Sequence, residues 1–392
     1  MGVWVKSGSR YETQDINGIS HFIEHMLFKG TQRRNAKELA LEIDNIGGQI
    51  NAFTAKEYTC FYTKTLDSHI HIAIDVLADM ITNSTLKESD VDLERNVVFE
   101  EISMCEDTPE DLVHEMIGQV SYKSSSLGYT ILGTHESLDG INSSKMRKYM
   151  SERYTSDNMV ISVAGNFDEQ KLAEMMEKAF SSIKKSDAVK EMPKAEFESG
   201  KLLMQRDIEQ VQVCISFDSV PAFDDRIMPM QAFNAGFGLN TSGTLFQKIR
   251  EERALVYSIY AYPVLCMGTG MFVINFGATK NNVEQVLSMI KSEIDLLKKD
   301  KCTPQEIALA KEQLKGSFIL SNEGVGSRMQ QAGRRLLFCD DVETDDQILE
   351  HIDAIDCESV SKVIDTIFDY SKMSVAAIGN IEGIDFDVLG RD

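Results

Sequence analysis

The spacing of apolar and polar positions along the chain predicts a mixture of helices and strands. Apolar residues that recur every three or four positions are typical of helices, and alternating β-branched or aromatic residues are typical of strands. Glycines end the first two predicted helices, at Gly30 and Gly47. The first half of the chain is predicted to form strands at 1–5, 49–54 and 57–64, and helices at 19–29, 36–45, 70–81 and 88–105.

The second half of the chain repeats this order of elements. A strand is predicted at 272–276, followed by helices at 282–297 and 303–318. The segment TLKESDVDLERNVV is similar in pattern to KCTPQEIALAKEQL, at an offset of roughly 216 residues. The stretch 182–200, rich in Lys, Glu and Ser, is typical of a linker. We therefore predict an α+β protein with two homologous α/β domains, at 1–186 and 201–392, joined by a linker at 187–200.

The first predicted strand begins at the first residue of the sequence. A strand that lacks a neighbour leaves an unpaired edge, which proteins generally avoid. We therefore expect that the first strands of the N-terminal domain precede Met1 and are absent from this sequence.

Composition narrows the possible functions. The hydrophobic share of 43% and the charged share of 26% are typical of a soluble globular protein. The net charge of −22 argues against nucleic-acid binding, which needs a basic surface. No apolar run approaches about 18 residues, so no membrane span is expected. The seven cysteines are scattered without a CxxC pair, which favours free thiols in a reducing compartment, and we expect a cytoplasmic protein.

The string His21-Phe22-Ile23-Glu24-His25 is the main candidate for chemistry. On a helix, His21, Glu24 and His25 project at about 0°, 300° and 40°, within one face. Two imidazoles one turn apart can both reach one metal ion at about 2.0–2.1 Å. The opposite face is apolar and consists of Ile19, Phe22, Ile23, Met26 and Leu27. No equivalent histidines occur in the second half, so we place the chemistry in the first domain.

A catalytic zinc site needs a third protein ligand and an open position for water. The predicted helix at 88–105 offers Glu94 and Glu101, which differ by only about 20° in projection and flank the same apolar stripe. Glu100 projects away from that stripe and is expected to be a solvated helix residue. Helical projection alone does not separate Glu94 from Glu101.

Five strings together resemble the pitrilysin and mitochondrial processing peptidase family of metallopeptidases: HFIEHMLFKGT, GGQINAFTAKEYT, LERNVVFEEI, LGYTILGTHESL and IREERALVYS. The resemblance runs through most of the chain. It implies that each domain is a mostly antiparallel sheet packed with helices and that the two domains form half of a clamshell. It also implies a Zn²⁺ cofactor.

The resemblance assigns roles to individual residues. It implies that His21, His25 and Glu101 bind the metal and that Glu94 supports them. It implies that the strand at 49–54 receives the substrate as an added strand, with main-chain contacts from Asn51 and Ala52. It names Arg250 and Tyr257 as hydrogen-bond donors to the oxyanion that forms during hydrolysis. The last two residues are expected to serve the zinc site of a partner subunit in a homodimer.

The expected function is a zinc-dependent metalloendopeptidase that hydrolyses peptides or unfolded polypeptide segments. Glu24 is expected to activate the attacking water and to pass its proton to the leaving amine. Two alternatives stay open: a protease that processes precursors near their N-terminus, and a non-catalytic peptide-binding or scaffold subunit of the same fold. Cleavage that depends on a metal ion would separate the scaffold from the two enzymes.

Overall fold

Residues 1–186, 191–339 and 341–390 are described by the computed structural model of the chain. Contacts divide the chain into two compact units, each assembled from separate stretches of sequence. The first unit consists of Met1–Ser103, Tyr129–Pro193 and Ser321–Val342. The second unit consists of Met104–Gly128, Lys194–Leu320 and Glu343–Asp392.

The first unit is built on a four-stranded antiparallel sheet with strand order β2-β3-β1-β4. Its strands are β1 (Gly2–Val5), β2 (Gln49–Thr54), β3 (Thr59–Lys64) and β4 (Met159–Ser162). Its helices are α1 (Ile19–Leu27), α2 (Ala36–Asp44), α3 (Ile70–Asn83), most of α4 (Glu88–Asp107), α6 (His135–Asp139), α7 (Ser143–Arg153), α8 (Glu169–Phe180) and α12 (Val325–Phe338).

The alternation of side chains along this sheet creates two separate apolar layers. Val3 and Phe61, which are register partners, are fully buried in a core with the apolar faces of α1 and α3. Their neighbours Trp4 and Cys60 belong to a second cluster, which α12 completes with Met329 and Leu337. The first layer fixes α1 against the sheet, and α1 carries the histidine motif.

The second unit is built on a five-stranded sheet with strand order β5-β9-β6-β8-β7, in which only the β5–β9 pair is parallel. Its strands are β5 (Gly200–Gln205), β6 (Gln210–Ser219), β7 (Val256–Cys266), β8 (Thr269–Thr279) and β9 (Met373–Gly379). Its helices include α5 (Pro109–Ser121), α9 (Ile227–Asn234), α10 (Val283–Asp300), most of α11 (Pro304–Ser321), α13 (Asp345–Asp353) and α14 (Cys357–Ile367).

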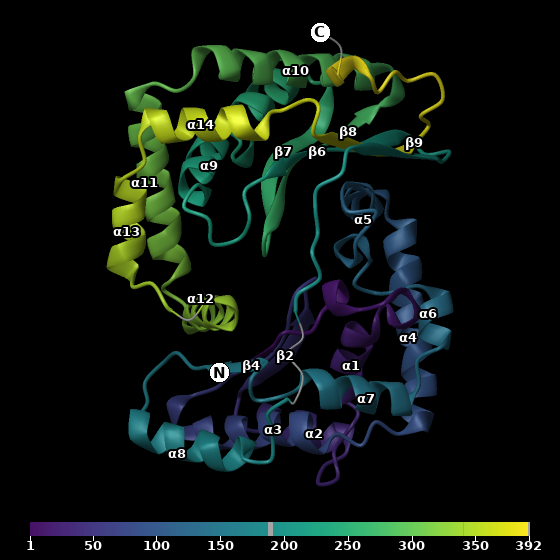
Figure 1. The fold of residues 1–392 in the computed structure, drawn as a ribbon, viewed down its shortest axis with the longest axis vertical. Helices are drawn as coiled ribbons and strands as arrows, with labels where there is room; N and C mark the ends of the chain where they lie inside the picture. Colours follow the sequence, from purple (N-terminus) through teal and green to yellow (C-terminus); the bar gives the residue numbers. More distant parts are fainter. Residues whose placement is uncertain (187–190, 340, 391–392) are drawn as a thin grey trace. The chain divides into compact units, whose positions relative to one another are not determined.

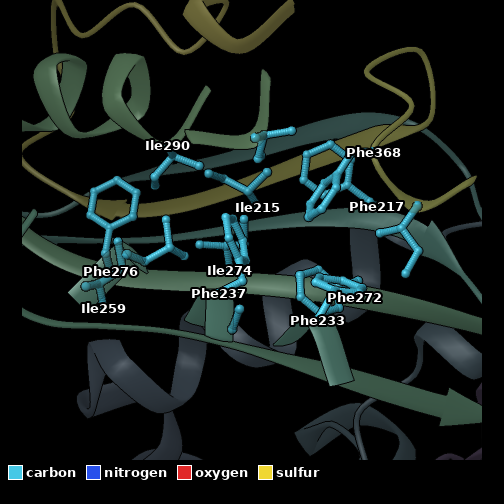
Figure 2. Close-up of a cluster of buried hydrophobic side chains, with 14 of the residues drawn as sticks. Ile215, Phe217, Phe233, Phe237, Ile259, Phe272, Ile274, Phe276, Ile290 and Phe368 are labelled. Atoms are coloured by element: carbon cyan, nitrogen blue, oxygen red, sulfur yellow. The ribbon is translucent and has the colours of Figure 1, made fainter. Parts of the chain in front are cut away.

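The two faces of this second sheet also carry different apolar layers. Phe217, Phe272 and Phe368 lie in the larger layer, where aromatic rings meet edge to face (Figure 2). On the opposite face, Cys214 and Val273 belong to a smaller cluster that includes α5. Both faces of the sheet are therefore covered.

One helix in each unit comes from the other half of the sequence. Helix α5 follows α4 along the chain but packs on β5, β6 and β9 of the second unit (Figure 1). Helix α12 follows α11 but packs on β1 and β4 of the first unit. Each compact unit therefore depends on both halves of the chain.

The predicted α+β architecture with antiparallel-rich sheets is confirmed, and two of the predicted strands differ from the observed ones by two or more residues at an end. Strand β3 begins at Thr59 because Glu57 lies in the preceding turn, where its carboxylate binds Arg10 at 2.5 Å. Strand β8 extends beyond the predicted 272–276 because both faces of this central strand are buried. Part of the predicted linker, 187–190, lies outside the described residues, and 191–199 contains no helix or strand. The domain boundaries at 186 and 201 stay a prediction.

Candidate metal centre

Helix α1 begins at a turn that a buried carboxylate holds in place. Gly18 adopts φ 91°, a left-handed conformation that favours glycine, and an added Cβ would lie 2.6 Å from the Leu132 carbonyl oxygen. The Glu12 carboxylate accepts hydrogen bonds from the backbone N–H groups of Gly18 and Ser20 and from the Asn17 side chain. These bonds satisfy amide groups at the helix start, which have no partner inside the helix.

Three predicted metal-binding side chains come together beside α1. Single donor atoms of His21, His25 and Glu101 all lie within 4.8 Å of one another. The His21 Nε2 atom is 3.7 Å from Glu101 Oε2, and the His25 Nε2 atom is 3.6 Å from Glu101 Oε1. All three side chains are half-buried. The structure therefore brings together the helix motif and one carboxylate of α4.

Glu94 and Glu101 occupy different places in this arrangement. The Glu94 carboxylate is 2.9 Å from His25 Nδ1, while its other oxygen lies 2.5 Å from the Lys29 ammonium group. A proton on Nδ1 that is shared with Glu94 leaves His25 Nε2 free as a lone-pair donor. The geometry therefore separates the two acids that helical projection left together: Glu101 faces both Nε2 atoms, and Glu94 orients one imidazole.

Glu24 lies on the same helix and is held by a chain of hydroxyl groups. The Thr54 hydroxyl at the end of β2 donates to the Glu24 carboxylate at 2.5 Å. Thr59 Oγ1 lies 3.2 Å from Thr54 Oγ1 and donates its own proton to the Ser7 carbonyl oxygen. Because Thr59 gives its only proton to Ser7, it cannot donate to Thr54, and the single Thr54 proton goes to Glu24, which is the closer of its two neighbours.

Burial sets the protonation of these groups. Burial, followed by the nearby charge of His25, lowers the pKa of His21 to about 3, which keeps this imidazole neutral near pH 7. Burial raises the pKa of the Glu24 and Glu101 carboxyl groups above their ordinary range, and the Thr54 hydrogen bond opposes this rise at Glu24. Neutral imidazole is the form that binds a metal ion.

The donor set fits a zinc ion. A tetrahedral ion bound at about 2.0–2.1 Å holds its donor atoms about 3.3 Å apart, close to the 3.6 and 3.7 Å found between the imidazoles and Glu101. Among the described residues, His21 Nδ1 and Glu101 Oε2 are buried side-chain atoms without a hydrogen-bond partner. The unpartnered carboxylate oxygen is the one nearest His21, where a cation would satisfy it. Two imidazoles and one carboxylate leave a fourth position for water.

The strand predicted to receive substrate is an edge strand. Among the residues of the first unit that the structure describes, β2 pairs only with β3, so its other edge is unpaired there. Asn51 is exposed, and its side-chain oxygen accepts the Ala52 backbone N–H at 2.8 Å. The Ala52 N–H group therefore donates to a side chain and not to the neighbouring strand β3.

Arg250 and Tyr257 lie together in the second unit. Arg250 belongs to a π-helical turn, Phe246–Glu251, and its guanidinium group lies 5.8 Å from the centre of the Tyr257 ring. Tyr257 lies near the start of the edge strand β7 and is 76% exposed. Arg250 also pairs with Glu251 at 3.0 Å. The two predicted donors are therefore neighbours, and the tyrosine hydroxyl is on an exposed side chain.

The sequence patterns did not identify three residues of the site, which are Glu12, Lys29 and Thr54. Lys29 and Thr54 lie inside strings that carry the family resemblance, but no spacing rule connects them to His25 or Glu24. The long separation between Thr54 and Glu24 is bridged only when β2 packs beside α1. No sequence signal marked Glu12 as the acceptor for the helix start.

Comparison with known proteins places the chain in a family. A family model described as insulinase (peptidase family M16) matches residues 1–135, and one described as peptidase M16 inactive domain matches residues 140–314. The uncharacterized zinc protease YmxG of Bacillus subtilis is 41% identical over 383 residues, which cover 97% of this chain and 93% of that protein. The chain belongs to peptidase family M16.

Other relatives agree with this assignment of the M16 chain. An uncharacterized zinc protease of Streptomyces coelicolor is 35% identical and covers 92% of the chain and 81% of its own length. The crystal structure of a protease from Helicobacter pylori has a TM-score of 0.88 at 20% identity, covering 96% of this chain and 92% of that one. A peptidase M16 inactive domain from Pseudomonas fluorescens has a TM-score of 0.89 at 16% identity, with the same coverage. The two structures share the fold, and the predicted family resemblance is confirmed.

No helix within the described residues is long and apolar enough to cross a membrane.

Proposed function

We propose that this M16 chain is a zinc-dependent metalloendopeptidase that hydrolyses peptides or unfolded polypeptide segments. The observation that carries the proposal is the convergence of His21, His25 and Glu101, with donor atoms within 4.8 Å and with Glu24 on the same helix. The names of the relatives, which are zinc proteases, support the same class of activity.

His21, His25 and Glu101 would hold the zinc ion. When bound, zinc lowers the pKa of a water molecule and polarises the peptide carbonyl group. Glu24 accepts the proton of the attacking water and delivers it to the nitrogen of the leaving amine. The raised pKa of Glu24, caused mainly by burial, suits a group that must both take and give a proton. Thr54 holds the Glu24 carboxylate in place through its hydroxyl group.

The unpaired edge of β2 is the proposed substrate site. An extended peptide added there would gain main-chain hydrogen bonds from Asn51 and Ala52 without a requirement for particular side chains. The edge follows directly from the strand order, because in the described part of the chain β2 has a neighbouring strand on one side only. Such binding favours unfolded segments, since a folded substrate has already paired its backbone.

Arg250 and Tyr257 are the proposed donors to the oxyanion, acting on a partner subunit's site in a homodimer. Their proximity and the exposure of Tyr257 support this role. Glu24→Gln and Tyr257→Phe are each expected to be inactive as purified homodimers, and mixing them should restore part of the activity. Absence of complementation between dimers that exchange subunits would contradict the proposal for the partner site.

The central test measures bound metal and peptide cleavage together. Glu101→Gln should lose zinc by elemental analysis, whereas Glu100→Gln, an exposed neighbour on the same helix, should keep it. Glu24→Gln should keep zinc and lose cleavage of a quenched peptide by a factor of about 10²–10⁴. A wild-type protein that binds zinc but shows no cleavage that a chelator abolishes would favour the scaffold subunit over both enzyme functions.

A further inference from the structure

Two cysteines of the second unit lie against each other although they are far apart in the sequence. Cys302 lies between α10 and α11, and Cys357 is the first residue of α14. The Cys302 thiol donates to the Cys357 backbone carbonyl oxygen at 3.8 Å, and the two thiols also interact with each other. Both are free, half-buried thiols. Neither has a role in the proposed hydrolysis.

The surroundings hold both thiols in position. Both side chains pack against the large apolar layer of the second unit. Lys301, immediately before Cys302, adopts φ 55° and pairs with Asp365 of α14, which ties the turn to the helix. Asp356 caps α14 through a reciprocal pair of hydrogen bonds with Ser359. The Cys302 sulfur therefore lies against Cys357 between well-anchored segments, which reduces the movement needed to join the two sulfur atoms.

We propose that Cys302 and Cys357 form an oxidisable dithiol that closes to a disulfide when the protein meets a low-molecular-weight disulfide. The Cys357 thiolate attacks one sulfur of the oxidant, forms a mixed disulfide and releases one thiolate. Cys302 then loses its proton and attacks the Cys357 sulfur, which releases the second thiol. The two protein thiols lose two electrons and two protons, and the oxidant gains them as two thiols.

The order of attack follows from the environment of Cys302. Burial, together with the hydrogen bond and the negative charge of the neighbouring Cys357 sulfur, raises the pKa of Cys302 to about 11. Cys302 therefore keeps its proton near pH 7, and Cys357 is assigned the first attack. Once the Cys357 sulfur is joined to the oxidant, its contribution to the raised pKa of Cys302 is removed before the second step, and burial remains as the main cause.

The disulfide would join the two ends of a long excursion of the chain. Between residues 302 and 357 the chain leaves the second unit, contributes Ser321–Val342 to the first unit and returns. A covalent link at its ends restricts this loop in the unfolded chain, which raises the thermal midpoint of the folded protein.

The full chain treated with oxidised glutathione under native conditions provides the test. Peptide mapping should find Cys302 joined to Cys357, with two of the seven thiols protected from alkylation and the effect reversed by dithiothreitol. Cys302→Ser should stop at a mixed disulfide on Cys357, and Cys105→Ser, a half-buried thiol elsewhere, should still form the link. The thermal midpoint of the wild type should rise on oxidation. Mixed disulfides alone in the wild type, or a link between other cysteines, would overturn the proposal.

Discussion

Glu12 is predicted to control both the stability of the first unit and the order of α1, the helix that carries the proposed metal-binding histidines. The Glu12 side chain is buried, and its carboxylate accepts three hydrogen bonds at 2.7–2.9 Å: two from the first turn of α1 and one from Asn17. Substitution with alanine leaves these three donors without their acceptor. His21, the first of the proposed metal-binding residues, is the residue next to Ser20 in α1.

The expected loss in the free energy of unfolding follows from the three hydrogen bonds that Glu12 accepts. Each buried donor left without an acceptor costs about 1–3 kcal/mol. Relief from burying a carboxylate offsets part of this loss, so we expect Glu12→Ala to lower the free energy of unfolding by about 3–5 kcal/mol. Glu12→Gln keeps one carbonyl acceptor but places an NH₂ group against a backbone donor, and we expect a loss of about 1–2 kcal/mol.

Urea unfolding followed by tryptophan fluorescence is the appropriate assay. The chain has a single tryptophan, Trp4, which is buried on β1 of the first unit and therefore reports on that unit. Glu177→Ala, on the exposed face of α8, is the matched control and should change stability by less than about 0.5 kcal/mol. Equal stability of Glu12→Ala and Glu177→Ala would contradict this role of the Glu12 carboxylate.

Replacement of Glu12 by glutamine is also predicted to change how the free energy of unfolding depends on pH. Burial raises the pKa of Glu12 above its ordinary value of 4.5, and its hydrogen bonds only partly oppose this rise. A raised pKa in the folded state means that the folded protein holds the proton more tightly, so this contribution is complete below pH 4.5 and is lost as pH rises through the folded value. Glu12→Gln has no titrating group there, so its stability should fall less steeply than that of the wild type over this range.

Three further predictions concern the site and the packing of α12. Thr54→Val should lower kcat by roughly 10-fold with zinc content unchanged, because the Glu24 carboxylate loses its donor, and Thr54→Ser should restore it. Lys29→Met should weaken zinc binding about 3- to 10-fold in a chelator competition, because Glu94 loses the cation that fixes its second oxygen, whereas Lys29→Arg should not. Gly333→Ala should destabilise the first unit by about 3 kcal/mol or more, since the new Cβ would lie 2.1 Å from Trp4 Nε1. On the same helix, Gly326→Ala meets no atom within 4 Å and should add up to about 1 kcal/mol.

Local pattern predicted the elements that carry the chemistry. The polar face formed by His21, Glu24 and His25 and the apolar face of α1 follow directly from helical periodicity, and the structure shows both. Periodicity also placed Glu94 and Glu101 on one helix, but a difference of about 20° in projection did not assign them different partners. Their separation depends on where α4 crosses α1, which is a property of the packed core.

Contacts between distant segments could not be predicted in the same way. An amphipathic pattern shows that a helix buries one face, but it does not show which sheet covers that face. The contact of Gly333 with Trp4 illustrates this, because α12 is far from β1 in sequence and no local signal links them. Thr54 and Lys29 were missed for the same reason, since their partners are chosen by tertiary packing.

The exchange of α5 and α12 means that the chain cannot be divided at its midpoint into two self-sufficient proteins. A fragment ending before residue 187 would leave Trp4 and Cys60 without the helix that shields them from water. A fragment beginning at residue 201 would expose the Cys214 and Val273 face of its sheet. Each half of the chain would therefore need a redesigned sheet surface before it could fold alone.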